Sequence, residues 1–399
     1  GVPPTGIFGE TPNQEAPLFV GRLPRGLAST PHLIGSVIAL GSTPYNQAPT
    51  LSAFPNNGLQ VSAGLTATAD VHTGALLETH NLPTYQSVGQ TRGVTLTYDS
   101  LRADPTVIYY FSIDHLPTLT ADQRLVVTLT ARLGDFSKTA DGLSASDALA
   151  LGLPTGANIY QIPASGAANP SYGAGIFLNL ESTDPVTGDP IYPDSGVYTF
   201  ILSYGIYSKI GNTYQGRLAQ LITPIAVVDE EDSPFGAGWG LNNYFQLYQG
   251  DGSVLLADGN GNSEIFNAPA TLGDPYTSES VDQSQLLQQS DGTFIRKMLD
   301  GTVYTFNDQG KLSTVKDRNG NITTYEYAGD HKQLLDIKDP VGLLTRFQYA
   351  GTHVSRIVGP DNGATLFSYS GDNLIQITDP DTTFNTFQYT NTTYTHLMT

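Results

Sequence analysis

The sequence contains no cysteine, two methionines and one tryptophan among its 399 residues. Without cysteine, the chain can form no disulfide and offers no thiolate to a metal ion, and the thiol hydrolases are excluded. The longest apolar stretch, around residues 33–40, is far too short to cross a bilayer. The first residues, GVPPTGIFGE, carry neither an initiator methionine nor a charged-then-apolar leader, which indicates a processed or excised piece of a longer protein.

Positive charge is also scarce. Lysine and arginine total 18 against 37 acidic residues, which gives a formal net charge of -19. Because such a surface repels phosphate backbones and anionic lipid headgroups, we expect no nucleic-acid partner and no membrane insertion. An acidic, cysteine-free chain rich in Thr, Gly and Tyr is typical of exported proteins, so we expect an extracellular or cell-surface location.

The abundant residues favour short strands and tight turns. The chain has 42 Gly, 25 Pro and 22 Tyr, and only 14% of its residues are charged. Alternation of apolar and polar residues at Val94, Leu96 and Tyr98, and again over 125–131, predicts half-buried strands. One short helix is predicted at 144–151, capped by Ser144. The sequence therefore predicts an all-β fold, with further strands at 107–113, 176–180, 197–204 and 218–228.

Changes in composition predict four ranges. Residues 1–90 are an extended, Gly/Pro-rich N-terminal segment, and residues 91–228 carry the strands of an Ig-like β-sandwich. Residues 229–240 form a linker in which an acidic run precedes alternating glycines around the lone Trp239. Residues 241–399 are β-hairpin repeats that are incomplete at the C-terminus.

The repeats are marked by pairs of aromatic residues. The second residue of each pair is a tyrosine, and successive tyrosines are separated by 22, 20 and 20 residues. Residues two apart on a strand share a face, so we expect both rings of a pair on one side of a sheet, with successive pairs stacked into a ladder. The eight ladder residues are Tyr325, Tyr327, Phe347, Tyr349, Phe367, Tyr369, Phe387 and Tyr389.

A single repeat should not be stable alone. Each ring can bury about 150 to 250 Å², and most of that gain is offset by ordering a unit of about twenty residues. Such arrays therefore need several units and a covered end. Since the last strand would leave its backbone groups unpaired, we expect further C-terminal chain, or another subunit, to pair at the open edge near Thr399.

The phrase FNDQGKL at 306–312, followed by DRNGN at 317–321, resembles the repeat of the RHS/YD-repeat family. TGALLETH at 73–80 resembles the lead-in of that family's shells, and SPFGAGW at 233–239 resembles its Gly-Trp motif. After the four ladder tyrosines the family's Asp is replaced by Ala, Ala, Ser and Thr. The resemblance implies an exported protein whose repeats wind an antiparallel β-sheet into a shell or solenoid, for enclosing a cargo such as a toxin or for adhesion.

Candidate chemical sites are few. Asp184, Asp189 and Asp194 could gather around Ca²⁺, although as turn residues beside Pro and Gly they need no metal. The run 258–262 imitates the start of an EF-hand loop but lacks the required Gly and Glu further on. No nucleophile elbow, phosphate-binding loop or helical histidine pair is present, so we expect no enzyme activity, no catalytic residue and no cofactor other than possible calcium.

The favoured interpretation is therefore a non-enzymatic structural or encapsulating part of an exported RHS/YD-repeat protein. One alternative is an adhesion or carbohydrate-binding module that recognises glycans or cell-surface proteins through exposed aromatic rings. A second is a subunit of an extracellular filament, and a β-propeller is an alternative fold. Trp239 is interpreted as a packed residue at the junction, with a contact role as the alternative.

Overall fold

The structure is a computed structural model of the chain. It describes residues 32–39, 43–44, 65–69, 76–103, 106–114, 119–160, 172–180, 182–183, 190–191, 194–250, 252–271, 273–278, 283–329, 332–390 and 396–398. These residues confirm the all-β prediction: they form antiparallel sheets, with one short parallel pair and a single helix. Within the described part of the chain, no helix is both long and apolar enough to span a bilayer.

The chain forms two compact units. Unit 1 takes in Gly1–Leu40, Thr106–Pro193 and Tyr198–Ile225, and unit 2 takes in Gly41–Pro105, Asp194–Val197 and Ala226–Thr399. Each unit therefore combines segments that are far apart in the sequence.

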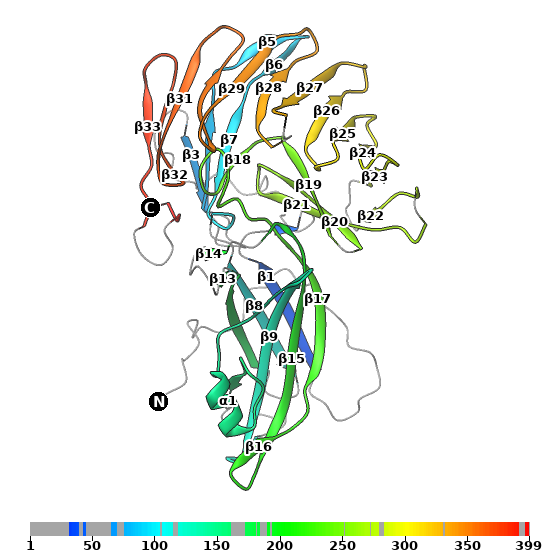
Figure 1. Cartoon of the computed structure of the whole chain (residues 1–399), viewed down its shortest axis with the longest axis vertical. Coiled ribbons are helices and arrows are strands. Elements are labelled where there is room, and N and C mark those ends of the chain that lie inside the picture. Colours follow the sequence, from blue (N-terminus) through cyan, green and yellow to red (C-terminus); the bar gives the residue numbers. More distant parts are fainter. Residues whose placement is uncertain are drawn as a thin grey trace. The chain divides into compact units, whose positions relative to one another are not determined.

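Unit 1 contains two main antiparallel sheets and a two-stranded ribbon (Figure 1). The first sheet has the order β1 (His32–Ala39), β8 (Thr106–Asp114), β12 (Tyr172–Asn179). The second has the order β10 (Phe136–Thr139), β9 (Gln123–Leu133), β15 (Gly196–Ile210), β16 (Thr213–Gln215), with β11 (Asn158–Tyr160) on β9 and β17 (Ala219–Val227) on β15. The ribbon is β13 (Ser182–Thr183) with β14 (Pro190–Ile191).

The helix α1 (Ala145–Leu151) lies where its capping residue predicts it. The Ser144 hydroxyl accepts a hydrogen bond from the backbone N–H of Asp147 at 3.2 Å. Gly152 ends the helix in the left-handed conformation at φ 68°, which glycine adopts without steric cost.

Unit 2 contains two small sheets and a two-stranded hairpin. The cover sheet has the order β18 (Trp239–Leu241), β7 (Thr95–Asp99), β4 (Leu76–Asn81), β3 (Leu65–Ala69), and the hairpin pairs β5 (Tyr85–Ser87) with β6 (Gln90–Arg92). The other sheet has the order β19 (Phe245–Gly250), β20 (Ser253–Asp258), β21 (Asn262–Asn267), β2 (Thr43–Pro44), with β22 (Thr277–Ser278) also on β21.

The largest element of unit 2 is an eleven-stranded antiparallel sheet, here called the hairpin array, whose strands pair strictly in sequence order (Figure 1). Every connection is therefore a local hairpin. The strands are β23 (Gln285–Gln288), β24 (Phe294–Lys297), β25 (Val303–Phe306), β26 (Leu312–Lys316), β27 (Ile322–Tyr327), β28 (Leu334–Lys338), β29 (Leu344–Ala350), β30 (His353–Val358), β31 (Ala364–Ser370), β32 (Asn373–Thr378) and β33 (Phe384–Thr386).

Two strands predicted to be half buried are covered on both faces. On β7, Thr97 and Asp99 are buried as well as the apolar residues, because the Thr97 hydroxyl donates to Asn242 Oδ1 at 2.7 Å and Asp99 lies against a buried arginine. On β9, Val126 is buried because it packs in an apolar cluster with Leu153, Ala157 and Tyr207. Alternation therefore indicates one buried face but does not show that the other face is exposed.

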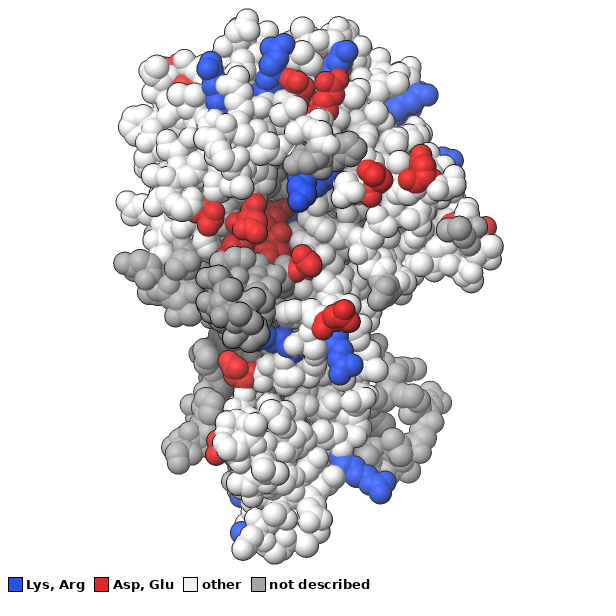
Figure 2. Space-filling view, in the orientation of Figure 1, with Lys and Arg blue, Asp and Glu red and all other residues white. Residues whose placement is uncertain are grey.

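On the face drawn in Figure 2, several acidic side chains gather in one patch. The face drawn in Figure 2 carries Lys and Arg as well as Asp and Glu, and most of it is uncharged. On the hairpin array, Asp336 and Arg346 form a cross-strand pair with Oδ1 to Nε at 3.7 Å. Since Arg346 is half exposed, such a pair contributes about 0–1 kcal/mol at most.

Candidate functional site

The structure brings all eight ladder residues together. Their rings lie in one apolar cluster on one face of the hairpin array, where Phe347, Phe367 and Phe387 are 3%, 6% and 7% exposed and the tyrosines are half buried. The cover sheet packs against the same cluster through residues that include Leu96 and Tyr98. The ladder is therefore an internal packing surface between two sheets.

A β-bulge interrupts four hairpins of the array, each at the second aromatic position. Gln348 pairs with Arg356, but Tyr349 pairs with Val354, so Ser355 is an extra residue. The same shift occurs at Thr305/Phe306, Glu326/Tyr327 and Ser368/Tyr369. A bulge disturbs the ladder of backbone hydrogen bonds and increases the local twist of the strands.

The tyrosine hydroxyls bind at these bulges, in a contact that we call the bulge link. Each hydroxyl donates a hydrogen bond to the backbone carbonyl of the residue fifteen positions earlier. That residue is the one that pairs with the second aromatic residue of the preceding hairpin, at its bulge. The links run from Tyr327 to Leu312 at 2.5 Å, Tyr349 to Leu334 at 3.0 Å, Tyr369 to Val354 at 2.7 Å and Tyr389 to Leu374 at 2.8 Å. Each repeat is thus tied to the one before it.

Burial keeps these hydroxyls protonated. It raises the pKa of Tyr349 to about 12, and it raises the pKa of Tyr327, Tyr369 and Tyr389 further. The tyrosines therefore act as hydrogen-bond donors at any physiological pH. The sequence carries a signal for this role that the spacing argument missed: the second aromatic of the four ladder pairs is always Tyr, whereas the first is Phe in three of them.

The tight turns between repeats are held by a side-chain motif. Asp317 Oδ1 accepts hydrogen bonds from the backbone N–H groups of Asn319 and Asn321 at 2.8 and 2.9 Å, and Gly320 takes the left-handed conformation at φ 87°. Asn307, Asp339 and Asp258 make the same pair of contacts to the residues two and four positions later. The carboxylates of these turns therefore have a structural role.

Trp239 lies in the interior of unit 2. It is fully buried, its ring centroid is 5.0 Å from that of Phe387 and 5.7 Å from that of Tyr98, and its Nε1–H donates to the Tyr389 hydroxyl at 3.1 Å. The residue between two glycines at the sequence junction thus joins the cover sheet to the last ladder pair.

Sequence reasoning missed a buried ionic cluster beside β7. Arg102 is fully buried; its guanidinium contacts Glu230 Oε1 at 3.0 Å and donates to the carbonyls of Asp258 and of Asn262. Burial raises the pKa of Glu230 to about 7, against the opposing effect of Arg102, and burial raises the pKa of Asp229 to about 8. The cluster fixes the end of β7 against the β20–β21 turn.

The described residues 396–398 lie against the end of the ladder. Tyr98 donates its hydroxyl hydrogen to the carbonyl of His396 at 2.8 Å and accepts from the backbone N–H of Met398 at 3.1 Å. The His396 ring contacts Glu231 at 2.9 Å, and Met398 forms a backbone bridge with Tyr389. This segment is therefore bound by the cover sheet and the array together.

The calcium prediction stays untested, because only one of its three candidates lies among the described residues. Asp184 and Asp189 lie outside the described residues, and Asp194 is exposed. Among the residues that the structure describes, no group of three His, Asp or Glu side chains is placed to hold a metal ion.

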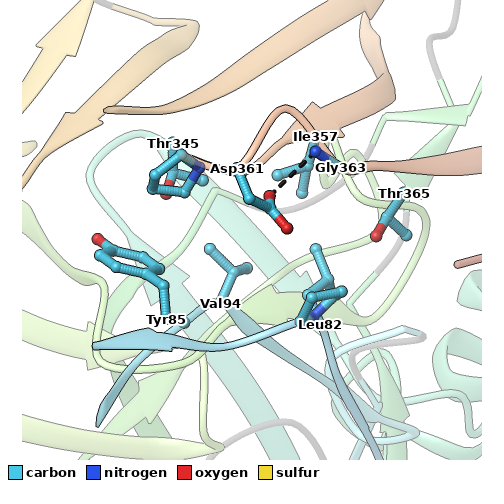
Figure 3. Close-up of a pocket in the computed structure, with 12 residues that line it drawn as sticks. Leu82, Tyr85, Val94, Thr345, Ile357, Asp361, Gly363 and Thr365 are labelled. Atoms are coloured by element: carbon cyan, nitrogen blue, oxygen red, sulfur yellow. Dashed lines mark hydrogen bonds between the residues drawn. The ribbon is translucent and has the colours of Figure 1, made fainter. Parts of the chain in front are cut away.

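A small pocket opens beside the β5–β6 hairpin of unit 2 (Figure 3). Its volume is about 20 Å³, which is room for about one water molecule or one small polar group. The side chains around it include Leu82, Tyr85, Val94, Thr345, Asp361 and Thr365.

Comparison with known proteins leaves the family open. The chain matches no protein-family model, and no curated protein matches it significantly.

Proposed function

We propose that this chain is a non-enzymatic structural part of an exported protein, and that its hairpin array forms the wall of a β-shell or surface scaffold. The observation that carries the proposal is the series of bulge links from Tyr327 to Tyr389, in which each repeat donates a hydrogen bond to the one before it. The aromatic side chains pack successive repeats against one another, and a wall built from repeats needs such contacts between neighbours.

The resemblance to the RHS/YD-repeat family supports the same proposal, since that family builds shells from such hairpins. A shell also needs its sheet to continue. Among the described strands, β33 pairs only with β32, so its other edge leaves backbone groups that support pairing of a further strand at this end of the array.

The proposal is tested in cells that make the protein. Antibodies raised against the folded chain should label intact cells or the culture medium, and protease added outside intact cells should remove the cell-bound label. Labelling that appears only after the cells are made permeable would overturn the exported scaffold.

A second test addresses the structural role of the ladder. Phe367→Ala should lower the free energy of unfolding of unit 2 by about 3–5 kcal/mol, which is the range for large-to-small changes in a core. We expect it to have no other effect on function. Loss of an activity from a variant whose stability is unchanged would contradict a purely structural ladder.

A further inference from the structure

A row of polar side chains runs along the inner face of the hairpin array. Thr323, Thr345, Thr365 and Asn385 each lie two positions before the first aromatic of a ladder pair, so they share its face. Thr345 is 6% exposed and Thr365 is 2% exposed. A buried hydroxyl costs free energy unless it has a hydrogen-bond partner, so each member of this polar row needs one.

One member of the polar row finds a partner in the β5–β6 hairpin. Arg92 donates from Nη1 to the Thr323 hydroxyl at 3.4 Å.

The other end of the polar row is served by β4. The distance from Asn385 Nδ2 to His80 Nδ1 is 3.4 Å. Thr345 and Thr365 lie in the middle of the row. For their hydroxyls, the described residues supply no hydrogen-bond partner.

The pocket lies at the place where the partners of Thr345 and Thr365 are missing. Figure 3 shows Asp361 and Thr365 beside one hollow, with Leu82 and Val94 beneath it and the Tyr85 ring at its side. Asp361 and Thr365 belong to the β30–β31 hairpin, and Tyr85 belongs to β5. The hollow therefore combines an aromatic face, a carboxylate, a buried hydroxyl and an apolar floor.

Asp361 is fixed with one oxygen left for a ligand. Its Oδ1 accepts from the backbone N–H of Gly363 at 3.0 Å, whereas Oδ2 has no hydrogen-bond partner among the described residues. A Cβ atom added at Gly363 would lie 3.1 and 3.2 Å from the two carboxylate oxygens, and one at Gly359 would lie 2.9 Å from Oδ1. The absence of side chains at these two positions keeps the space around the carboxylate open.

We propose that this pocket is a saccharide subsite, which takes one hydroxyl or hydroxymethyl group of a hexose while the sugar ring lies on Tyr85. A sugar hydroxyl can donate to Asp361 Oδ2 and also accept from, or donate to, the Thr365 hydroxyl. The apolar floor suits the C–H groups of the sugar. It suits an ammonium ion poorly, because a buried charge needs more than one carboxylate at the rim to offset its desolvation.

The subsite goes beyond the scaffold function proposed above and does not depend on it. A wall with no saccharide site would still be a wall, and the two proposals are tested by different measurements. The subsite would let a surface scaffold also recognise glycans.

The experiment first measures binding of the purified chain to a glycan array. Binding of the free oligosaccharides that are recognised on the array is then measured by saturation-transfer difference NMR. Thr365→Val replaces the hydroxyl by a methyl group of similar size, and Asp361→Asn removes the charge from an exposed side chain. Each variant should weaken binding at least tenfold. Thr365→Ser keeps the hydroxyl and should retain most of the binding.

Asp381 provides the matched control. It makes the same contact in the next turn of the array, from Oδ1 to the backbone N–H of Thr383 at 3.0 Å, but it does not line the pocket. Asp381→Asn should therefore leave binding unchanged. The proposal is overturned if no hexose-containing glycan binds, if binding survives both Thr365→Val and Asp361→Asn in folded protein, or if only lysine-rich peptides bind and the same variants abolish that binding.

Discussion

Replacing Tyr349 by Phe tests the bulge link directly. The change deletes one hydroxyl that donates to the Leu334 carbonyl at 3.0 Å and leaves the ring in the apolar cluster. A hydrogen bond between neutral groups contributes about 0.5–1.5 kcal/mol net, so we expect unit 2 to lose about 1 kcal/mol. Tyr349 is the best site for the test, because Tyr327 also bonds to another tyrosine and Tyr389 also bonds to Trp239.

The lone tryptophan supplies the assay. Trp239 is fully buried in unit 2, so its fluorescence during urea unfolding reports on that unit and not on unit 1. With an m-value of about 3 kcal/mol per molar urea, a loss of 1 kcal/mol lowers the midpoint by about 0.3 M. Tyr369→Phe should cause a similar loss by itself, because it deletes the hydroxyl that donates to the Val354 carbonyl at 2.7 Å.

Tyr325→Phe is the matched control. Tyr325 lies in the same ladder, but its hydroxyl makes no hydrogen bond within the described part of the chain. Removing that hydroxyl should leave the midpoint unchanged or raise it slightly, because a half-buried polar group is deleted without loss of a partner. Equal shifts for Tyr325→Phe and Tyr349→Phe would refute the reasoning, as would no shift for Tyr349→Phe.

Four further changes test the surroundings of the ladder, each measured as the urea midpoint from the fluorescence of Trp239. Thr382 has φ 72°, a left-handed conformation that favours glycine, so Thr382→Gly should stabilise unit 2 by about 1 kcal/mol. Gly320 has φ 87°, so Gly320→Ala should destabilise unit 2 for the same reason, and the opposite signs would refute the turn assignment. Because the pKa of Glu230 is raised from 4.5 to about 7, the folded chain retains a proton that the unfolded chain releases, so stability should fall between pH 5 and 8. Glu230→Gln should reduce that fall by about 2–3 kcal/mol, and an unchanged pH profile would contradict this. Arg102→Met leaves buried acidic groups unpaired and should cost about 3–5 kcal/mol; an unchanged midpoint would show that the ion pair is dispensable.

The sequence predicts the local part of this fold well. Alternation and turn residues place β8 and β17 within one residue of their observed bounds, but they miss the start of β12 and the end of β15. The aromatic spacing identifies which residues face the core of the array. These features depend on residues that are neighbours in the sequence. Such neighbours have fixed relative directions on a strand, so their pattern can be interpreted without knowing the rest of the fold.

The long-range pairings could not be predicted in this way. β7 pairs with β18, so Tyr98 lies opposite Trp239 across about 140 residues of sequence. Alternation shows that Tyr98 faces a core but does not say which strand completes that core. For the same reason, the pocket beside Thr365 is invisible in the sequence, because it depends on how the segment around Tyr85 is placed over the array.

The bulge link also explains why the repeats tolerate the changes that they show. In the four ladder pairs, the residue after the tyrosine is Ala, Ala, Ser or Thr, whereas the tyrosine itself does not vary. The side chain of the following residue is exposed or half buried, whereas the tyrosine both packs inward and satisfies a carbonyl at the preceding bulge. Phenylalanine could supply the packing but not the hydrogen bond. A spacing of about twenty residues is then the length of chain that forms one hairpin with its bulge. It also places the next tyrosine hydroxyl beside the carbonyl at the preceding bulge.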